Sequence, residues 1–333
     1  MVHALRRSPR YDVPMSLRRP TKALIAAIAE RDGAVPDEQE IRDRLGISTM
    51  SLMTDSDPQR GVDAAALVRA VAAGARKIEV GADFGPSHFP IGDERALERL
   101  STWYTQHGAE IYSVHSPLAR VPRAWDDDEV ARLIDAMAIV KAKVLLLHYV
   151  FTERDEWEAA MATMERLVER CAPHDIRLSI ETDTDMSFDA GFADFFDFPR
   201  VGICCDTGHT GAFFGNLNVL AEAGNAVATM ATAHHKLNHL HLSDVSIEPL
   251  PRPHATQTLK PRRDHWSPGL GCTNWTVLFQ ALHATDYPGC FMFEIWTEDE
   301  RRFDNLATFP QRLAAGELGR GFPGAASPGG SDR

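Results

Sequence analysis

Short apolar runs that end in an acidic or histidine side chain recur along this chain, and they constrain its fold more than any other feature. Each run is 3–6 residues long, and helix-like sequence separates it from the next. Five of the runs end at His115, His148, Glu181, Asp206 and Glu294, and a sixth carries His241 within it. Parallel strands that alternate with helices can close into a barrel whose C-terminal strand ends converge on one active site. Carboxylates and imidazoles that meet there are typical ligands of a divalent metal ion, so the pattern indicates a metal-dependent enzyme.

Eight strand–helix units are predicted, and this number favours a (β/α)8 TIM barrel of the α/β class over a doubly wound open sheet. We place the strands at residues 46–52, 77–80, 110–115, 143–148, 176–181, 201–206, 238–242 and 291–295. We place the helices at residues 63–73, 93–107, 126–140, 155–171, 188–196, 217–232, 275–283 and 300–313. A loop of about 25 residues, rich in proline and arginine, follows the seventh strand.

The barrel accounts for most of the chain, because such a domain takes about 250 residues. We assign residues 46–316 to it. Residues 1–45 form an N-terminal extension with a basic start and two short helices, which we expect to pack on or close one end of the barrel. An arm that binds a partner is the alternative. Residues 317–333 are rich in glycine, proline and serine and are expected to form a flexible tail.

Composition excludes some classes of protein. A formal net charge of −12 argues against a general nucleic-acid binder, although it does not exclude a local basic cleft. No apolar stretch approaches the roughly 18 residues of a membrane span, and no apolar segment follows the N-terminal arginines as in a secretory signal. The five cysteines are odd in number and lack a C-x-x-C pair, so we expect free thiols in the cytoplasm, with a catalytic cysteine as a minor alternative.

Four residues are the strongest candidates for metal ligands. Glu181 and Glu294 each end an apolar run, and Asp206 ends another, followed by a glycine and His209. A carboxylate that leaves a buried strand must be paired, hydrogen-bonded or bound to metal, and a helix cap is the competing role for Asp206. His241 is nearer its strand end than His239, with which it shares a face.

Three carboxylates and one imidazole suit Mn²⁺, Mg²⁺, Co²⁺ or Zn²⁺. Asp244, three residues after His241, is a candidate to orient one of these ligands.

Further short motifs then point to a family. They are I-E-V at Glu79, V-H-S-P at His115, L-L-H at His148, S-I-E-T at Glu181, D-T-G-H at Asp206–His209, H-L-S-D at His241–Asp244, H-W-S-P-G-L-G at His265–Gly271 and F-E at Glu294. In order and spacing this set resembles the xylose-isomerase-like barrel superfamily, over about residues 46–313. That superfamily includes sugar and sugar phosphate isomerases and epimerases, and the apurinic-site endonucleases.

The resemblance implies a role for each matching position. Glu181, Asp206, His241 and Glu294 would bind one divalent ion, and the two glutamates would also move protons on opposite faces of a small polyhydroxylated substrate. The remaining positions would contact that substrate: His209 at a hydroxyl, His265 and Arg263 at its far end, His115 and His148 in the pocket wall, and Trp266 or Trp296 against the sugar carbons.

The implied activity is isomerisation or epimerisation through removal of a proton α to a carbonyl and a metal-stabilised enediolate. A dehydratase or lyase that uses the same enediolate is a close alternative.

Two other classes of function are alternatives. An apurinic-site endonuclease of this superfamily would bind three ions, but Arg263 stands where an aspartate ligand is expected, with Asp264 adjacent. A barrel that has lost catalysis and only binds is the last alternative, and it conflicts with the complete set of ligands for one ion. Barrels of this type are often homo-oligomers, so we expect a dimer or tetramer only as a general tendency.

Overall fold

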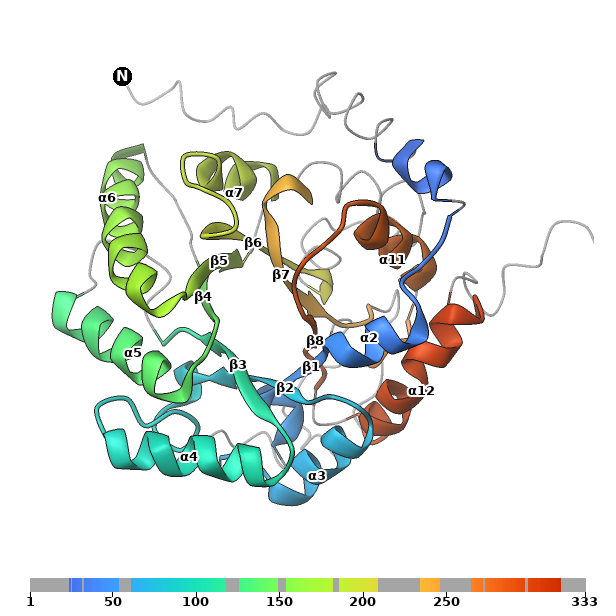
Figure 1. Ribbon diagram of the computed structural model, residues 1–333, viewed down its shortest axis with the longest axis horizontal. Coiled ribbons are helices and arrows are strands. Elements are labelled where there is room, and N and C mark those ends of the chain that lie inside the picture. Colours follow the sequence, from blue (N-terminus) through green and yellow to red (C-terminus); the bar gives the residue numbers. More distant parts are fainter. Residues whose placement is uncertain are drawn as a thin grey trace, which may run out of the picture.

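The computed structural model is a closed barrel of eight parallel strands surrounded by helices (Figure 1). It describes residues 24, 26–31, 33–53, 61–117, 126–148, 154–181, 186–208, 234–245, 265–271, 273–296 and 299–318. Strands pair in chain order, and β8 closes the ring by pairing with β1. The predicted (β/α)8 barrel is therefore confirmed, and the open sheet is wrong. None of the described helices is both long and apolar enough to cross a bilayer.

The strands are short and mostly buried on both faces. They are β1 (Leu45–Ser48), β2 (Lys77–Gly81), β3 (Glu110–His115), β4 (Val144–His148), β5 (Arg177–Glu181), β6 (Val201–Asp206), β7 (Leu237–Leu242) and β8 (Phe291–Phe293). Continuous apolar runs suit this position, because helices cover the outside of a parallel barrel while side chains fill its inside. Two register shifts interrupt the ladders, one at Ile78/Glu79 between β2 and β3 and one at Ile203/Cys204 between β6 and β7.

Helices follow the strands as the sequence predicts. They are α3 (Ala64–Ala72), α4 (Glu94–Gln106), α5 (Asp127–Val140), α6 (Arg154–Cys171), α7 (Met186–Ala193), α11 (Trp275–Ala284) and α12 (Arg302–Ala314). Aspartates begin three of them, since the carboxylates of Asp63, Asp93 and Asp126 accept backbone N–H groups of the first turn. The helix predicted at residues 217–232 and, of the tail predicted at 317–333, residues 319–333 lie outside the described residues.

The predicted first strand is too long. β1 ends at Ser48, and residues Thr49–Leu52 form a 3-10 helix instead. The Ser48 hydroxyl accepts the N–H of Met50 at 3.2 Å and so begins the helical turn, which the apolar pattern of this segment does not reveal.

The end of the N-terminal extension packs against the barrel. Its helix α2 (Glu38–Arg44) leads directly into β1 and buries Ile41. The Arg44 guanidinium donates to the backbone carbonyls of Tyr287 and Gly289 and lies over the Phe291 ring at 4.2 Å. These partners immediately precede or begin β8, so this part of the extension covers the N-terminal end of the barrel, opposite the strand ends that carry the candidate ligands.

Candidate metal centre and active site

Four candidate ligands from four different strands meet at the C-terminal end of the barrel. Glu181 and Asp206 are the last residues of β5 and β6, His241 is the penultimate residue of β7, and Glu294 directly follows β8. One ligand atom of each lies within 4.8 Å of the corresponding atom of every other. All four residues are buried. The fold therefore brings together the whole set that the sequence singles out.

The Nδ1 atom of His241 faces the three carboxylates. It lies 3.1 Å from Glu294 Oε2, 3.3 Å from Glu181 Oε1 and 3.6 Å from Asp206 Oδ2. Asp206 is held in place because its other oxygen, Oδ1, accepts the N–H of Gly208 at 2.6 Å. Three buried carboxylates surround one imidazole, and a divalent cation would balance their charge better than a single imidazole proton does. The donor set fits a hard or borderline divalent ion.

The charge of each of these groups depends on its neighbours. Burial raises the pKa of Glu294, but His241 and His265 outweigh it and lower that pKa to about 2. The pKa of Glu181 likewise falls well below its usual value, because His241, His148 and His115 outweigh burial. Burial lowers the pKa of His241, but Cys204 and the surrounding carboxylates outweigh it and raise that pKa well above the ordinary imidazole value. Without a cation, the centre is thus two ionised glutamates around a protonated His241.

A second group of possible ligands adjoins the first through Glu181. Its Oε2 atom lies 3.1 Å from His148 Nε2 and 3.3 Å from His115 Nε2, and the two imidazole nitrogens are 3.0 Å apart. On its other side, His115 Nδ1 lies 3.5 Å from Asp83 Oδ1. Burial lowers the pKa of His115, but Asp83 and Glu181 outweigh it and raise that pKa well above its usual value. A single carboxylate therefore joins a four-residue centre to a pair of histidines.

His265 also reaches the centre, from the segment after the long loop. Its Nε2 atom lies 3.5 Å from Glu294 Oε2 and 3.7 Å from Asp206 Oδ2, and its backbone has a positive φ of 60°. The backbone of Trp266, next in the chain, pairs with that of Asp244 in an isolated antiparallel bridge. This bridge fixes the segment close to the end of β7.

Asp244 does not orient a metal ligand as the sequence suggested. Its buried carboxylate instead accepts backbone N–H groups of Val245, Gly269, Gly271 and Thr273 at 2.8–3.0 Å. A Cβ atom on Gly271 would collide with the Val245 carbonyl oxygen, so only glycine allows the chain this close. Asp244 thus holds in place the segment that carries His265.

A cavity of about 170 Å³ opens beside the candidate centre. The residues that line it are Ser48, Met50, Gly81, Asp83, Phe84, His115, His148, Glu181, His265, Glu294 and Trp296. Trp266, proposed from the sequence as a wall of the pocket, is not among them; it is buried, with its backbone paired to Asp244. Trp296 takes that place, with its ring 5.9 Å from the ring of His265. His209 and Arg263 lie outside the described residues.

The contacts of Glu79 could not be predicted from the sequence. This carboxylate lies inside the barrel, and its Oε1 atom is 2.6 Å from Nε2 of His241. The motif I-E-V placed Glu79 on β2, but nothing in the local sequence shows which side chain it meets.

The buried cysteines do not have the properties of catalytic residues. Burial raises the pKa values of Cys171, Cys205 and Cys290 to about 12, so these thiols are not nucleophiles at neutral pH.

Comparison with known proteins supports the barrel fold. No curated protein sequence matches the chain. Among solved structures, D-psicose 3-epimerase with D-tagatose from Clostridium cellulolyticum H10 is 13% identical and has a TM-score of 0.59, with 83% of this chain and 100% of that chain covered. The probable 3-DHS dehydratase AsbF from Bacillus anthracis is 14% identical, with a TM-score of 0.58 and coverage of 81% and 98%.

A third similar structure, the IOLI protein with a binding zinc atom, is 14% identical, with a TM-score of 0.53 and coverage of 82% and 95%. At such low identity these likenesses bear on the fold alone. The sequence model of one family matches residues 67–315, which is most of the barrel. The chain therefore belongs to the xylose isomerase-like TIM barrel family.

Proposed function

We propose that this protein is a divalent-metal-dependent isomerase or epimerase of a sugar, a sugar phosphate or a related keto-polyol. One observation carries the proposal: two ionised glutamates, Glu181 and Glu294, belong to one four-residue metal-ligand group and line the same cavity. Family membership and the similarity to an epimerase support it. The proposed ligands of a single Mn²⁺, Mg²⁺, Co²⁺ or Zn²⁺ ion are Glu181, Asp206, His241 and Glu294.

The size and lining of the cavity suit a small polar substrate. Pockets for drug-sized ligands typically measure about 300–1,000 Å³, so a cavity of about 170 Å³ fits a molecule of monosaccharide size better. Asp83, His115 and His148 offer hydrogen bonds on one side, and His265 with Trp296 forms another. The polar groups suit hydroxyls, and the indole offers an apolar surface to C–H groups.

The two glutamates have the charge state that proton removal requires. Both lack a proton at neutral pH, because their pKa values are lowered, so either can act as the base toward a carbon α to a carbonyl. A divalent cation held by the four residues would polarise that carbonyl and stabilise the negative charge of the enediolate. When Glu294 removes the α-proton, the ionised Glu181 has to obtain a proton before it can deliver one to the opposite face. His115 lies 3.3 Å from Glu181 and holds a proton, so it is the proposed source.

A dehydratase or lyase would share the first step. Removal of the α-proton is followed there by loss of a β-hydroxyl instead of return of the proton. The similarity to a probable dehydratase keeps this outcome within the proposal.

Exchange of the α-proton with solvent tests both outcomes together. The metal-loaded protein would be incubated with a panel of ketoses and keto-polyols in D₂O, and NMR would follow deuterium at the α-carbon, which reports return of a proton, and loss of the β-hydroxyl, which reports elimination. We expect the wild type to convert at least one substrate, and neither Glu181→Gln nor Glu294→Gln to form product, because each variant lacks one of the two groups that the mechanism requires. Incorporation at the wild-type rate in both variants would refute the two-glutamate mechanism.

A phosphodiesterase of the apurinic-site type is the second candidate, favoured by one observation. His115, His148 and Glu181 offer ligand atoms within 4.8 Å of one another, as a further ion would need. The acidic net charge of −12 opposes it. Incision of duplex DNA at an abasic site by protein loaded with Zn²⁺ or Mn²⁺ would favour this candidate, and we expect no incision.

A further inference from the structure

Glu79 is a buried carboxylate in the middle of the barrel. Its relative exposure is 0%, and it lies on β2, one step inside the candidate metal centre. Layers of branched apolar side chains normally fill a TIM barrel at this depth. A carboxylate placed there loses its hydration, so it destabilises the fold unless partners replace the lost water. Its presence calls for a specific set of partners.

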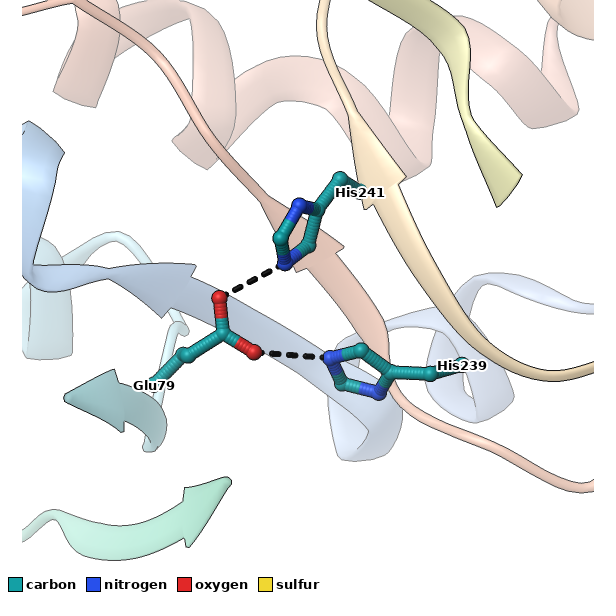
Figure 2. A group of neighbouring side chains, drawn as sticks. All are labelled: Glu79, His239 and His241. Atoms are coloured by element: carbon teal, nitrogen blue, oxygen red, sulfur yellow. Dashed lines mark hydrogen bonds and ion pairs between the residues drawn. The ribbon is translucent and has the colours of Figure 1, made fainter. Parts of the chain in front are cut away.

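Three groups supply these partners. Oε1 of Glu79 lies 2.6 Å from His241 Nε2, while Oε2 lies 2.9 Å from His239 Nε2 and accepts the Ser113 hydroxyl at 2.8 Å. Figure 2 shows the carboxylate between the two imidazoles, with one oxygen directed at each ring. Both oxygens are therefore occupied, and the orientation of the carboxylate is fixed from more than one side.

Two irregularities of the sheet create this arrangement. The register shift between β2 and β3 places Ser113 opposite Glu79, and the shift between β6 and β7 places His239 opposite Cys204. Shifts of this kind redirect side chains and are frequent beside active sites. Both register shifts thus lie beside Glu79 or one of its partners, one between β2 and β3 and the other between β6 and β7.

The contacts decide which nitrogen of His241 carries a proton. An ionised carboxylate only accepts hydrogen bonds, so each imidazole nitrogen that faces Glu79 must bear a hydrogen. His241 therefore donates through Nε2, which directs the Nδ1 lone pair of the neutral ring toward Glu181, Asp206 and Glu294. His239 also donates through Nε2, and the Tyr112 ring stacks against it with centroids 6.2 Å apart.

We propose that Glu79 is a positioning residue that fixes His241 as an Nδ1 ligand of the divalent ion, while Ser113 and His239 fix Glu79. The inference rests on the proposed metal centre. A carboxylate behind a ligating imidazole sets its tautomer and ring orientation and makes the ligating nitrogen more basic. Glu79 also places a negative charge behind the His241 imidazole, 2.6 Å from its Nε2 atom. It does not touch the cavity, so it acts through His241 and not on the substrate.

The test compares metal affinity in three proteins. Metal-free wild type, Glu79→Gln and Ser113→Ala would be titrated with Mn²⁺ by calorimetry, with thermal unfolding followed in parallel. Glu79→Gln keeps the shape but removes the charge, and its amide can accept from only one of the two rings. We expect it to bind Mn²⁺ about 10–100-fold more weakly. Ser113→Ala removes one hydrogen bond to the carboxylate but keeps its charge and both imidazole contacts, so it should weaken Mn²⁺ binding less than Glu79→Gln does, by under about tenfold.

A second measurement needs no variant. In ¹⁵N imidazole spectra of the Zn²⁺-loaded wild type, His241 should carry its proton on Nε2 and bind the ion through Nδ1. Binding through Nε2, or equal Mn²⁺ affinity in wild type and Glu79→Gln, would overturn the inference.

These experiments also distinguish failure of the proposed metal centre from failure of the positioning role of Glu79. If the wild type bound no divalent ion, the metal centre itself would be wrong. The metal-free spectra, at a pH that neutralises His241, would still decide on Glu79: a proton on Nε2 supports its positioning role, and a proton on Nδ1 excludes it.

Discussion

Replacement of Asp244 by alanine should destabilise the protein far more than the loss of one surface carboxylate. Asp244 accepts four backbone N–H groups at the end of β7. The bonds from Val245 and Thr273 are buried, and those from Gly269 and Gly271 are partly buried. A buried donor without an acceptor costs about 1–3 kcal/mol, whereas a partly buried donor can turn to water. Loss of the acceptor for these two buried N–H groups thus lowers the free energy of unfolding by about 2–6 kcal/mol, and we expect about 4 kcal/mol. The buried indole N–H of Trp275, 3.4 Å from the carboxylate, loses its acceptor as well.

Urea unfolding of the metal-free protein measures this change in the free energy of unfolding. Asp63→Ala is the matched control, because Asp63 accepts a single exposed N–H, from Ala65 at 3.0 Å, at the start of α3. Loss of such a cap costs about 1 kcal/mol. Hydrogen exchange at Gly271 and Thr273 detects local release of the segment if global unfolding changes little. A cost no larger than that of Asp63→Ala, with both amides still protected, would refute the reasoning.

Other predictions concern the centre itself. Glu294→Gln should lower kcat by about 10²–10⁴-fold, because a proton-transfer group is lost. Circular dichroism of the variant should show an intact fold. The raised pKa of His241 means that the protonated ring stabilises the metal-free fold below pH 6.5, and that this contribution declines as pH rises through the higher folded pKa. Metal binding should therefore release a proton near neutral pH, and the affinity for the ion should rise with pH. Titration calorimetry in buffers of different ionisation enthalpy measures the proton release, and a metal affinity independent of pH would contradict the prediction. In Gly271→Ala the added Cβ would collide with the Val245 carbonyl oxygen, so we expect the segment that carries His265 to be displaced and the free energy of unfolding to fall. An unchanged free energy of unfolding would contradict this prediction.

The barrel and its main ligands could be predicted because local patterns specify them. Short apolar runs separated by helices define parallel strands, and the C-terminal ends of such strands lie at one end of a barrel. Glu181, Asp206 and Glu294 each stand at such an end, so their meeting follows from topology alone. His241 could be preferred to His239 for the same reason, and the structure places it beside the three carboxylates.

What the sequence could not show depends on contacts between distant segments. Glu79 meets His241 across 162 positions of the chain, and a register shift that leaves no local signal sets its environment. Asp244 follows a histidine in a motif that suggests an orienting role, yet its acceptor oxygens are used by a segment 25–29 residues further on. Trp266 and Trp296 were equal candidates until the pairing of Trp266 with Asp244 became visible.

The central claim is that Glu181, Asp206, His241 and Glu294 form one divalent-metal site. The direct test is the number and affinity of divalent ions per chain, measured by elemental analysis after purification without chelator or metal-affinity resin, and by Mn²⁺ titration of the metal-free protein. The account predicts about one tightly bound ion per chain, lost in Asp206→Asn, a variant that leaves both proposed proton-transfer glutamates in place. No bound ion in the wild type, or full binding in Asp206→Asn, would contradict it.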